Sequence, residues 1–256
     1  MKVVVIGSGN VAYHLASLLA QSRHTLLQIA GRNKNAVSVL AKKLKCSFTT
    51  DIKNVDQGAD VFIIAVNDDS IANVAKQLPE TEKIVLHTSG STSIDVLKKY
   101  KNSGVLYPLQ SLNKQSATLE KDITFCVEAS NLKTEKALSQ LGKSIGNKTV
   151  KLNSNNRLIL HLAAVVVNNF VNHLYVLSHD FLDKSKIDFS LLLPLIERTG
   201  KKVEVAHPRK VQTGPAMRND QRTIKKHIAL LQEDPMLKKF YNEFSKAIHQ
   251  YHKNRN

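Results

Sequence analysis

The chain has 256 residues, of which 42% are hydrophobic, so it can bury a sizeable core in one or two domains. Its formal net charge of +16 is spread evenly, because residues 1–152 carry 20 Lys and Arg against 12 Asp and Glu, and residues 153–256 carry 17 against 9. Without a basic arm, a zinc finger or an aromatic–basic stacking motif, this charge does not indicate a nucleic-acid partner. It is more typical of a solvated surface that attracts an anionic cofactor.

The N-terminus and the two cysteines favour a cytoplasmic protein. The first residues enter a strand pattern directly and lack the regions of a secretory signal. Cys46 and Cys126 lie in separate strand-like segments. We expect two reduced, buried thiols rather than a disulfide or a metal pair, and we expect no metal site.

The first half of the chain alternates short apolar strands with amphipathic helices. Strands are expected at residues 2–6, 26–30, 46–49, 61–66, 83–87, 104–108, 123–128 and 148–152. Helices are expected at residues 11–22, 36–45, 70–78, 93–101 and 132–145. This alternation predicts an α/β domain over residues 1–152, with a Rossmann-like, mostly parallel, doubly wound sheet.

Residues 153–256 are predicted to form an all-helical domain, because the strand pattern stops. Helices are expected at residues 157–182, 188–207 (interrupted by Pro194), 218–232 and 234–253. The stretch from Leu158 to His179 has 22 uncharged residues, long enough to cross a bilayer. Its polar side chains would be costly in lipid, however: Asn168, Asn169, Asn172, His161, His173 and His179. We therefore expect no membrane contact but a helix packed against a second subunit in a homodimer.

A glycine-rich turn follows the first strand and opens the first helix. Gly7 suits the sharp turn, Gly9 lets a pyrophosphate approach the backbone, and Ala12 keeps the helix close to the sheet. The free N–H groups of the helix then bind the phosphates. The predicted contacts in this turn are Gly7, Ser8, Gly9, Asn10 and Val11. A tight turn without any ligand is the alternative.

The residues after the second strand favour NADP over NAD. An NAD site usually has Asp or Glu here, to accept hydrogen bonds from the ribose. This chain has Arg32, Asn33 and Lys34 instead, which offer a guanidinium, an amide and an ammonium group to a 2′-phosphate.

Further candidates lie at the carboxyl ends of the later strands, where ligands bind in open α/β sheets. Val66, Asn67 and Asp68 are expected to border the cofactor. His87 is a candidate proton donor and Ser89 is a candidate for orienting a substrate, while a hydrogen bond from His87 to its own loop is the alternative. Tyr107 is a candidate substrate contact.

A polar stripe on the long helix is expected to supply another wall of the site. His161, Asn168, Asn172, Tyr175 and His179 follow helical spacing. His161 and Asn168 are candidate catalytic residues and Asn172 is a candidate substrate contact. The alternatives are contact with a partner subunit and, for His161, a packing role. The helix carries no Lys between Leu158 and His179, which disfavours the chemistry of 3-hydroxy-acid dehydrogenases.

The segment TGPAMRND (213–220) adds two candidate substrate contacts, Thr213 and Arg218. The guanidinium of Arg218 can hold a carboxylate or a phosphate through two hydrogen bonds. A structural pair between Arg218 and Asp220 is the alternative.

Seven motifs carry a resemblance that spans nearly the whole chain: GSGNVA (7–12), AVNDDSI (65–71), HTSGS (87–91), YPLQS (107–111), HLAAVVVNNF (161–170), LLPLIERT (192–199) and TGPAMRND (213–220). Together they resemble a Rossmann-like NADP oxidoreductase family with a C-terminal helical domain of unknown function. The chain is more distantly similar to pyrroline-5-carboxylate reductase and the deazaflavin-dependent NADP oxidoreductases. The resemblance implies a fold and an NADP cofactor, but no particular substrate. Many relatives have His in place of Tyr107 and Gly in place of Asn219, so these two positions depart from the pattern.

Taken together, the motifs predict an NADPH-dependent oxidoreductase that reduces a small carbonyl or imine in a cleft between its domains. A non-catalytic protein that binds or senses NADP is the alternative, because no complete catalytic constellation is recognisable. A nucleic-acid-binding role rests on charge alone.

Overall fold

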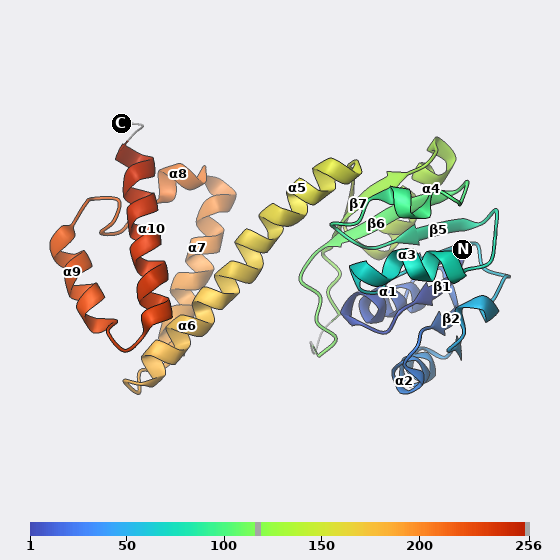
Figure 1. Cartoon of the computed structure of the whole chain (residues 1–256), viewed down its shortest axis with the longest axis horizontal. Helices are drawn as coiled ribbons and strands as arrows, with labels where there is room; N and C mark the ends of the chain where they lie inside the picture. The colour runs from blue at the N-terminus through green and yellow to red at the C-terminus, as the bar shows by residue number, and fades with distance from the viewer. Residues whose placement is uncertain (116–118, 254–256) are drawn as a thin grey trace. The chain divides into compact units, whose positions relative to one another are not determined.

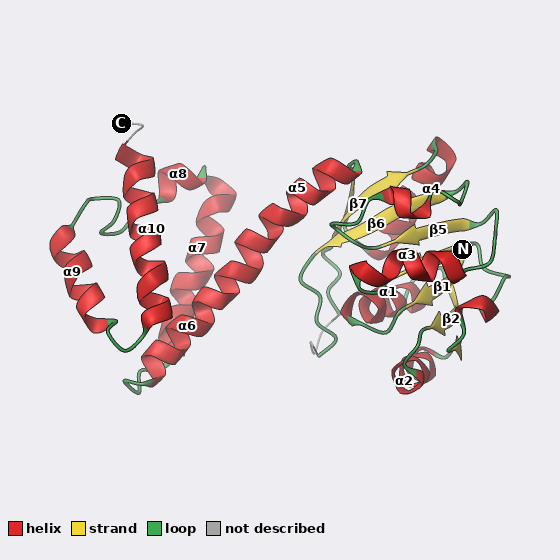
Figure 2. Ribbon diagram, viewed as in Figure 1, coloured by secondary structure: helices red, strands yellow, loops and turns green. Residues whose placement is uncertain are grey.

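The computed structural model describes residues 1–115 and 119–253, and it divides into two compact units, Met1–Asn168 and Asn169–Asn256 (Figure 1). The first unit holds the sheet and the second is helical (Figure 2). This confirms the predicted fold class. The sequence-based boundary at residue 152 marks the end of the last strand, whereas the two compact units meet within the long helix.

The described part of the first unit is built on an eight-stranded sheet with the order β3-β2-β1-β4-β5-β6-β7-β8. Neighbouring strands run parallel, except that β6 and β7 are antiparallel. All the predicted strands are confirmed: β1 (Lys2–Ile6), β2 (Thr25–Ala30), β3 (Ser47–Thr49), β4 (Val61–Ile64), β5 (Ile84–His87), β6 (Ser103–Leu109), β7 (Thr124–Ala129) and β8 (Lys148–Lys151).

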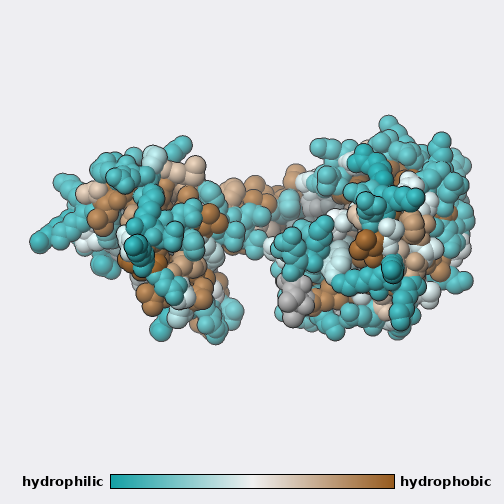
Figure 3. Space-filling model, turned by 90° about the horizontal axis from the view of Figure 1, so that it is seen from below, coloured by the Kyte–Doolittle hydropathy of each residue, from teal (hydrophilic) through white to brown (hydrophobic). Residues whose placement is uncertain are grey.

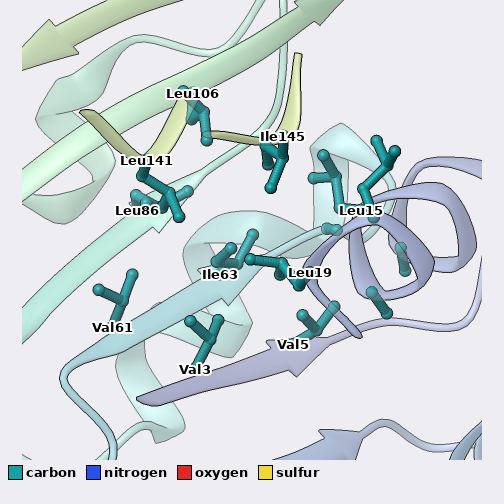
Figure 4. Packing of buried hydrophobic residues seen from close by; sticks show 14 of the residues in the cluster. Val3, Val5, Leu15, Leu19, Val61, Ile63, Leu86, Leu106, Leu141 and Ile145 are labelled. Carbon is teal, nitrogen blue, oxygen red and sulfur yellow. The ribbon is translucent and has the colours of Figure 1, made fainter. Parts of the chain in front are cut away.

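Helices pack on both faces of this sheet: α1 (Asn10–Ala20), α2 (Lys34–Leu44), α3 (Asp68–Gln77) and α4 (Leu132–Ile145). Helix α5 (Ser154–Ala164) follows β8. Successive side chains of β1 enter opposite cores, which explains why the strand is apolar throughout. Val3 and Val5 pack with Leu15, Leu19 and other side chains of α1 and α4 (Figure 4). Val4 and Ile6 belong to a second cluster that includes residues of α3. Both cysteines are free thiols, and Cys126 is buried as predicted, whereas Cys46 is only partly buried.

The helix predicted at residues 93–101 is wrong. The chain forms only a 3₁₀ turn, Ile94–Leu97, which the side chain of Ser93 caps by accepting from the N–H of Asp95. Leu97 and Tyr100 are both buried in the second core, and the Tyr100 hydroxyl donates to the carbonyl of Ala75 at 2.7 Å. Because residues three apart already share a face in a 3₁₀ turn, this burial needs no longer helix.

The long helix expected from the uncharged stretch is present over Ser154–Asp183. It consists of α5, a π-helical segment (Val165–Phe170) and α6 (Val171–Asp183). By length and composition this helix could span a membrane, and none of its most apolar window is buried within the described residues. The i→i+5 hydrogen bonds of a π segment shift the helical phase. The predicted polar stripe therefore does not follow one regular 3.6-residue spacing.

The second unit continues with a 3₁₀ turn (Phe189–Leu192), α7 (Leu193–Val205), α8 (Pro208–Val211), α9 (Gln221–Leu230) and α10 (Pro235–Lys253). The predicted helix over residues 188–207 is thus a turn followed by a helix. Pro194 lies in the first turn of α7, where its missing N–H breaks no intrahelical hydrogen bond.

Few apolar side chains of the second unit are buried. Within residues 169–253 the buried ones are Ala216, Ile224 and Leu231. Brown patches on the space-filling view mark apolar residues at the surface of this unit (Figure 3). Large apolar side chains are exposed on several of its elements, among them Phe170, Val176, Leu191, Leu193, Leu195, Val203, Val205, Leu230, Met236 and Phe244. The described part of the second unit lacks a dry core comparable to those of the first.

Candidate functional site

A cleft lies at the carboxyl ends of β1, β2 and β4, where the strand order reverses direction. The register pairs Ile6 with both Ala30 and Ile64, so these three strand ends are level. This is the position at which open α/β sheets bind ligands. The cleft is lined by Ile6, Gly7, Ser8, Gly9, Gly31, Arg32, Asn33, Ile52, Ala65, Val66, Asn67, Ser70, Asn73, Val74 and Gln77.

The fold itself requires the first glycine of the turn. Gly7 has φ = +138°, a conformation that L side chains rarely adopt. A Cβ atom there would overlap the carbonyl oxygen of Ala65 on the neighbouring strand segment and crowd the Cβ of Ala12. Gly7 therefore lets the chain turn sharply against β4.

The fold does not require the second glycine. Gly9 has φ = −78° and ψ = −173°, which any residue adopts, and no atom lies within 4 Å of the position that a Cβ would occupy. Gly9 lines the cleft, so its missing side chain leaves open space beside the start of α1. A glycine that the protein itself does not need is well suited to close approach by a ligand.

The N-terminus of α1 offers free donors to an anion. Gly9 is the N-cap and provides no side-chain cap, and the first turn holds no acidic residue. The first N–H groups of a helix have no intrahelical partner, and the dipole makes this end positive. Asn10 and Val11 lie in this first turn but outside the cleft lining, and the Asn10 side chain accepts from the N–H of Lys114 at 3.3 Å. An anion bound at this helix end would therefore contact these two residues through their backbone N–H groups.

Of the three residues predicted to bind a 2′-phosphate, Arg32 and Asn33 line the same cleft as the α1 turn. Arg32 is exposed. Asn33 caps α2, because its side-chain oxygen accepts from the N–H of Ala36 at 3.0 Å, while its NH₂ group stays available for an acceptor. Lys34 begins α2 outside the cleft lining. None of the fifteen lining residues is an Asp or a Glu.

After β4, the structure separates the three predicted cofactor contacts. Val66 and Asn67 line the cleft, and Asn67 is the N-cap of α3 without a side-chain cap bond. Asp68 lies outside the lining, and its carboxylate accepts a hydrogen bond from the Ser91 hydroxyl. Asp68 therefore ties the start of α3 to the loop after β5.

Sequence reasoning missed one wall of the cleft. Ser70, Asn73, Val74 and Gln77 of α3 face it, together with Ile52. Spacings of three and four residues place these α3 side chains on one helix face. Polar residues among the apolar ones in the 70–78 segment were the signal, but the segment was interpreted only as a helix covering the sheet.

The structure does not support His87 as a proton donor. Its side chain is 0% exposed, and Nδ1 accepts from the N–H of Ser89 at 3.1 Å. Burial, followed by the charge of Arg157, lowers the pKa of His87 from 6.5 to about 4, so the ring is neutral near pH 7. The loop-bonded alternative fits this geometry. The Ser89 hydroxyl is likewise engaged, because it accepts from the N–H groups of Ser91 (3.1 Å) and Thr92 (2.9 Å).

A buried ion pair anchors α5 beside this loop. Arg157 is 1% exposed and donates to the Glu128 carboxylate of β7, to the carbonyl of Thr92 and to the Ser154 hydroxyl at 3.2 Å. Glu128 also accepts from the N–H of Ser154 at 2.9 Å. Removing one member of such a network would leave a buried charge without its partner. Sequence analysis missed the network because its members are far apart along the chain.

Tyr107 and His161 form a pair that the sequence did not connect. The Tyr107 hydroxyl lies 2.9 Å from Nδ1 of His161, and the two rings meet edge to face with centroids 5.6 Å apart. A Cβ on Gly90 would lie 2.7 Å from that Nδ1 and 2.9 Å from Cζ of Tyr107. Burial, with weaker contributions from Cys126 and Asp68, raises the pKa of Tyr107 to about 12.

The other candidate residues neither line the cleft nor belong to the Tyr107–His161 pair. Asn168 lies exposed in the π segment, and Asn172 is exposed on α6. Thr213 and Arg218 are exposed in the segment before α9. Asp220 caps α9 by accepting from the N–H (3.0 Å) and the hydroxyl (2.7 Å) of Thr223.

The segment before α9 also explains one departure from the family pattern. Asn219 has φ = +55°, in the left-handed region that glycine adopts freely and asparagine adopts more readily than most residues. The Gly that many relatives have at this position suits the same backbone conformation.

Metal ligands are not grouped in the described residues, since no three His, Cys, Asp or Glu side chains come together there. The catalytic and substrate-binding roles assigned to the candidate residues from the sequence stay predictions. The structure brings together the cleft residues and, separately, Tyr107 with His161.

Two family models match the chain: a Rossmann-like domain over residues 1–110 and a domain of unknown function, DUF2520, over residues 123–248. No curated protein matches it. A crystal structure from Bacteroides fragilis, named "putative NADP oxidoreductase", is 33% identical, with a TM-score of 0.89 over 97% of this chain and 98% of that one.

More distant solved structures share the fold. A 1-pyrroline-5-carboxylate reductase from Streptococcus pyogenes is 13% identical, with a TM-score of 0.65 over 98% of each chain. A reductive aminase from Aspergillus terreus, in complex with NADPH and ethyl-5-oxohexanoate, is 11% identical, with a TM-score of 0.76 over 99% of this chain and 94% of that one. The chain belongs to the family of Rossmann-like proteins with a C-terminal DUF2520 domain, together with the Bacteroides fragilis protein.

Proposed function

We propose that this protein is an NADPH-dependent oxidoreductase that reduces a small carbonyl or imine compound. The observation that carries the proposal is Gly9, a glycine with ordinary dihedral angles and open space around it, at the uncapped N-terminus of α1. A pyrophosphate placed there would accept hydrogen bonds from the first N–H groups of the helix. A side chain at position 9 would fill that space.

Arg32 supports NADP rather than NAD as the cofactor. Its guanidinium can bind a 2′-phosphate through two hydrogen bonds, and the Asn33 amide can add a third. Any 2′-phosphate in this cleft would meet no Asp or Glu among the lining residues. The backbone N–H groups of the α1 turn would hold the pyrophosphate, and Val66 and Asn67 would border the part of the cofactor nearer the later strands.

The reaction class rests on similarity to reductases. The structural relatives include enzymes named as a pyrroline-5-carboxylate reductase and a reductive aminase bound to NADPH. When bound, NADPH supplies a hydride to a polarised carbon, and carbonyls and imines are the usual acceptors. A non-catalytic NADP-binding or sensing protein stays the second candidate. It is favoured by the burial of His87, whose Nδ1 accepts from the N–H of Ser89, and by the Ser89 hydroxyl, which accepts from two N–H groups of the loop.

We also propose that the protein works as a homodimer formed through its helical unit. Residues 169–253 bury few of their own apolar side chains, while Leu191, Leu195, Val205 and others are exposed. Apolar surface of this extent is typical of an interface between subunits. A second copy suits the long helix better than a bilayer does, because Asn168, Asn169 and Asn172 would be costly to place in lipid.

The test is binding followed by turnover. Wild-type protein should quench or shift NADPH fluorescence on binding, and Gly9→Val should lose this response while keeping the wild-type circular dichroism and melting temperature. NADPH oxidation is then followed with a panel of aldehydes, ketones and cyclic imines. Binding without any oxidation would favour the sensor, and unchanged binding by folded Gly9→Val would remove the nucleotide site.

A further inference from the structure

We propose that the Tyr107 hydroxyl donates the proton to the substrate oxygen during carbonyl reduction, and that His161 is the positioning residue that orients and resupplies it. The proposal rests on the proposed reductase function. It differs from the sequence-based expectation, in which His87 supplied the proton and Tyr107 only contacted substrate.

The pair lies along the same edge of the sheet as the nucleotide cleft. Ile64, at the end of β4, pairs with His87 of β5, which in turn pairs with Val105 of β6. Tyr107 is two residues farther along β6, so it lies beyond the carboxyl end of β5. The Asp68–Ser91 hydrogen bond then links the loop after β5 to the residue that follows Asn67 of the cleft.

The chemistry of a phenol suits donation at this point. Tyr107 is half-buried, and its raised pKa keeps the hydroxyl protonated near neutral pH. Hydride addition to a carbonyl carbon gives an alkoxide, which is a stronger base than a phenolate. The proton therefore moves from Tyr107 Oη to the substrate oxygen, one O–H bond breaking as the other forms.

His161 completes the proton balance. A phenolate left at Tyr107 takes the proton from Nδ1–H of His161, 2.9 Å away, as solvent protonates the other ring nitrogen, so the imidazole stays neutral throughout. His161 is only partly buried, so water can reach the ring. In sum, the hydride and one solvent proton convert C=O to CH–OH, and NADPH becomes NADP⁺.

The loop after β5 favours Tyr107 and His161, rather than His87, as the source of the proton. His87 Nδ1 already accepts from the N–H of Ser89, and its ring is enclosed. Gly90, by contrast, passes directly beside both rings of the pair, and its missing Cβ is what allows them to come together there. The loop after β5 is thus shaped around Tyr107 and His161.

The pairing is tested first without cofactor. In ¹⁵N NMR spectra of histidine-labelled protein, the His161 ring signals are identified by their loss in His161→Ala. Because the Tyr107 hydroxyl is a direct partner of Nδ1, Tyr107→Phe should change the tautomer ratio that these signals report. Unchanged His161 signals in Tyr107→Phe would overturn the pair.

The proton role is tested with 4-nitrobenzaldehyde as the carbonyl probe. Tyr107→Phe should reduce kcat by about 10²–10⁴-fold, the usual scale for general acid catalysis, while the Kd for NADPH changes less than about threefold. His161→Ala should lose turnover that added imidazole partly restores, which a merely structural role would not allow. Tyr13→Phe, whose hydroxyl contacts Lys43, is the matched control and should keep wild-type turnover.

The outcomes separate this proposal from the proposed function. A wild-type kcat in Tyr107→Phe would overturn the role of Tyr107 as proton donor, and a His161→Ala defect that imidazole does not restore would overturn the role of His161. Neither result would contradict the proposed reductase function. Wild-type protein that reduces 2-methyl-1-pyrroline but not the aldehyde would likewise overturn the proton role without contradicting the reductase function. Protein that binds NADPH but reduces neither probe overturns both.

Discussion

The two units of the chain differ in what they bury. The first packs two cores, one on each face of its sheet, and encloses polar groups such as His87 and Arg157. The described part of the second unit buries few apolar side chains and leaves Val205, for example, 86% exposed. Folding alone therefore buries the apolar strands of the first unit, whereas the exposed apolar side chains of the second fit the proposed dimer interface.

This difference predicts that replacing a Phe by Ala has a much larger effect on stability in the first unit than in the second. Phe62 is 1% exposed in the first unit, so Phe62→Ala should lower the free energy of unfolding by about 3–5 kcal/mol in urea titrations. Phe244 is about half-exposed on α10, so Phe244→Ala should not change the urea concentration at which the first unit unfolds. Equal losses for the two variants would contradict the contrast.

The buried His87 predicts a pH dependence confined to the first unit. Its pKa is about 4 when folded against 6.5 as the unperturbed value, so the unfolded chain binds more protons between these pH values. Stability should therefore fall as pH drops from 6.5 to 4, by roughly 3 kcal/mol in all. His87→Asn should flatten this part of the curve in urea titrations at several pH values. If His87→Asn kept the full dependence of stability on pH, another titratable group would have to be responsible for it.

The exposed apolar side chains of the second unit predict a weaker dimer when one becomes charged. Leu191→Asp should raise the dimer dissociation constant by about 10²-fold, because burying a carboxylate in an apolar interface is costly. Lys225→Asp, at an exposed position of α9, serves as the control and should change it little. Sedimentation at micromolar concentration measures both, and a wild-type monomer would contradict the proposed interface.

The periodicity of the sequence was sufficient to predict the sheet but not the contacts between distant side chains. Runs such as VVVI and VFII must be buried on both faces, so strands and a parallel sheet follow from local pattern. The placement of Gly7, Gly9 and Arg32 at one cleft was predictable because these residues closely follow neighbouring strands in the sequence. The Tyr107–His161 contact joins residues 54 apart, and the Arg157–Glu128 pair joins residues 29 apart, so neither leaves a local pattern.

His87 shows a second limit of sequence reasoning. Its position at the carboxyl end of β5 was predicted correctly, but its protonation state depends on burial and on the charge of Arg157. The 93–101 segment shows the same limit in the backbone. Its apolar spacing fits a helix, yet Tyr100 bonding to Ala75 and the start of β6 at Ser103 leave space only for a turn.

The central claim is that the cleft of the first unit binds NADPH through the α1 turn and Arg32, and calorimetric titration with NADPH and NADH tests it most directly. Wild-type protein should bind NADPH at least about tenfold more tightly than NADH, because only NADPH offers a 2′-phosphate to the guanidinium. Arg32→Asp should abolish that preference by adding repulsion to the lost hydrogen bonds, while NADH binding stays within a few-fold of wild type. Equal affinity of the wild-type protein for the two coenzymes, or equal losses in Arg32→Asp, would contradict the account.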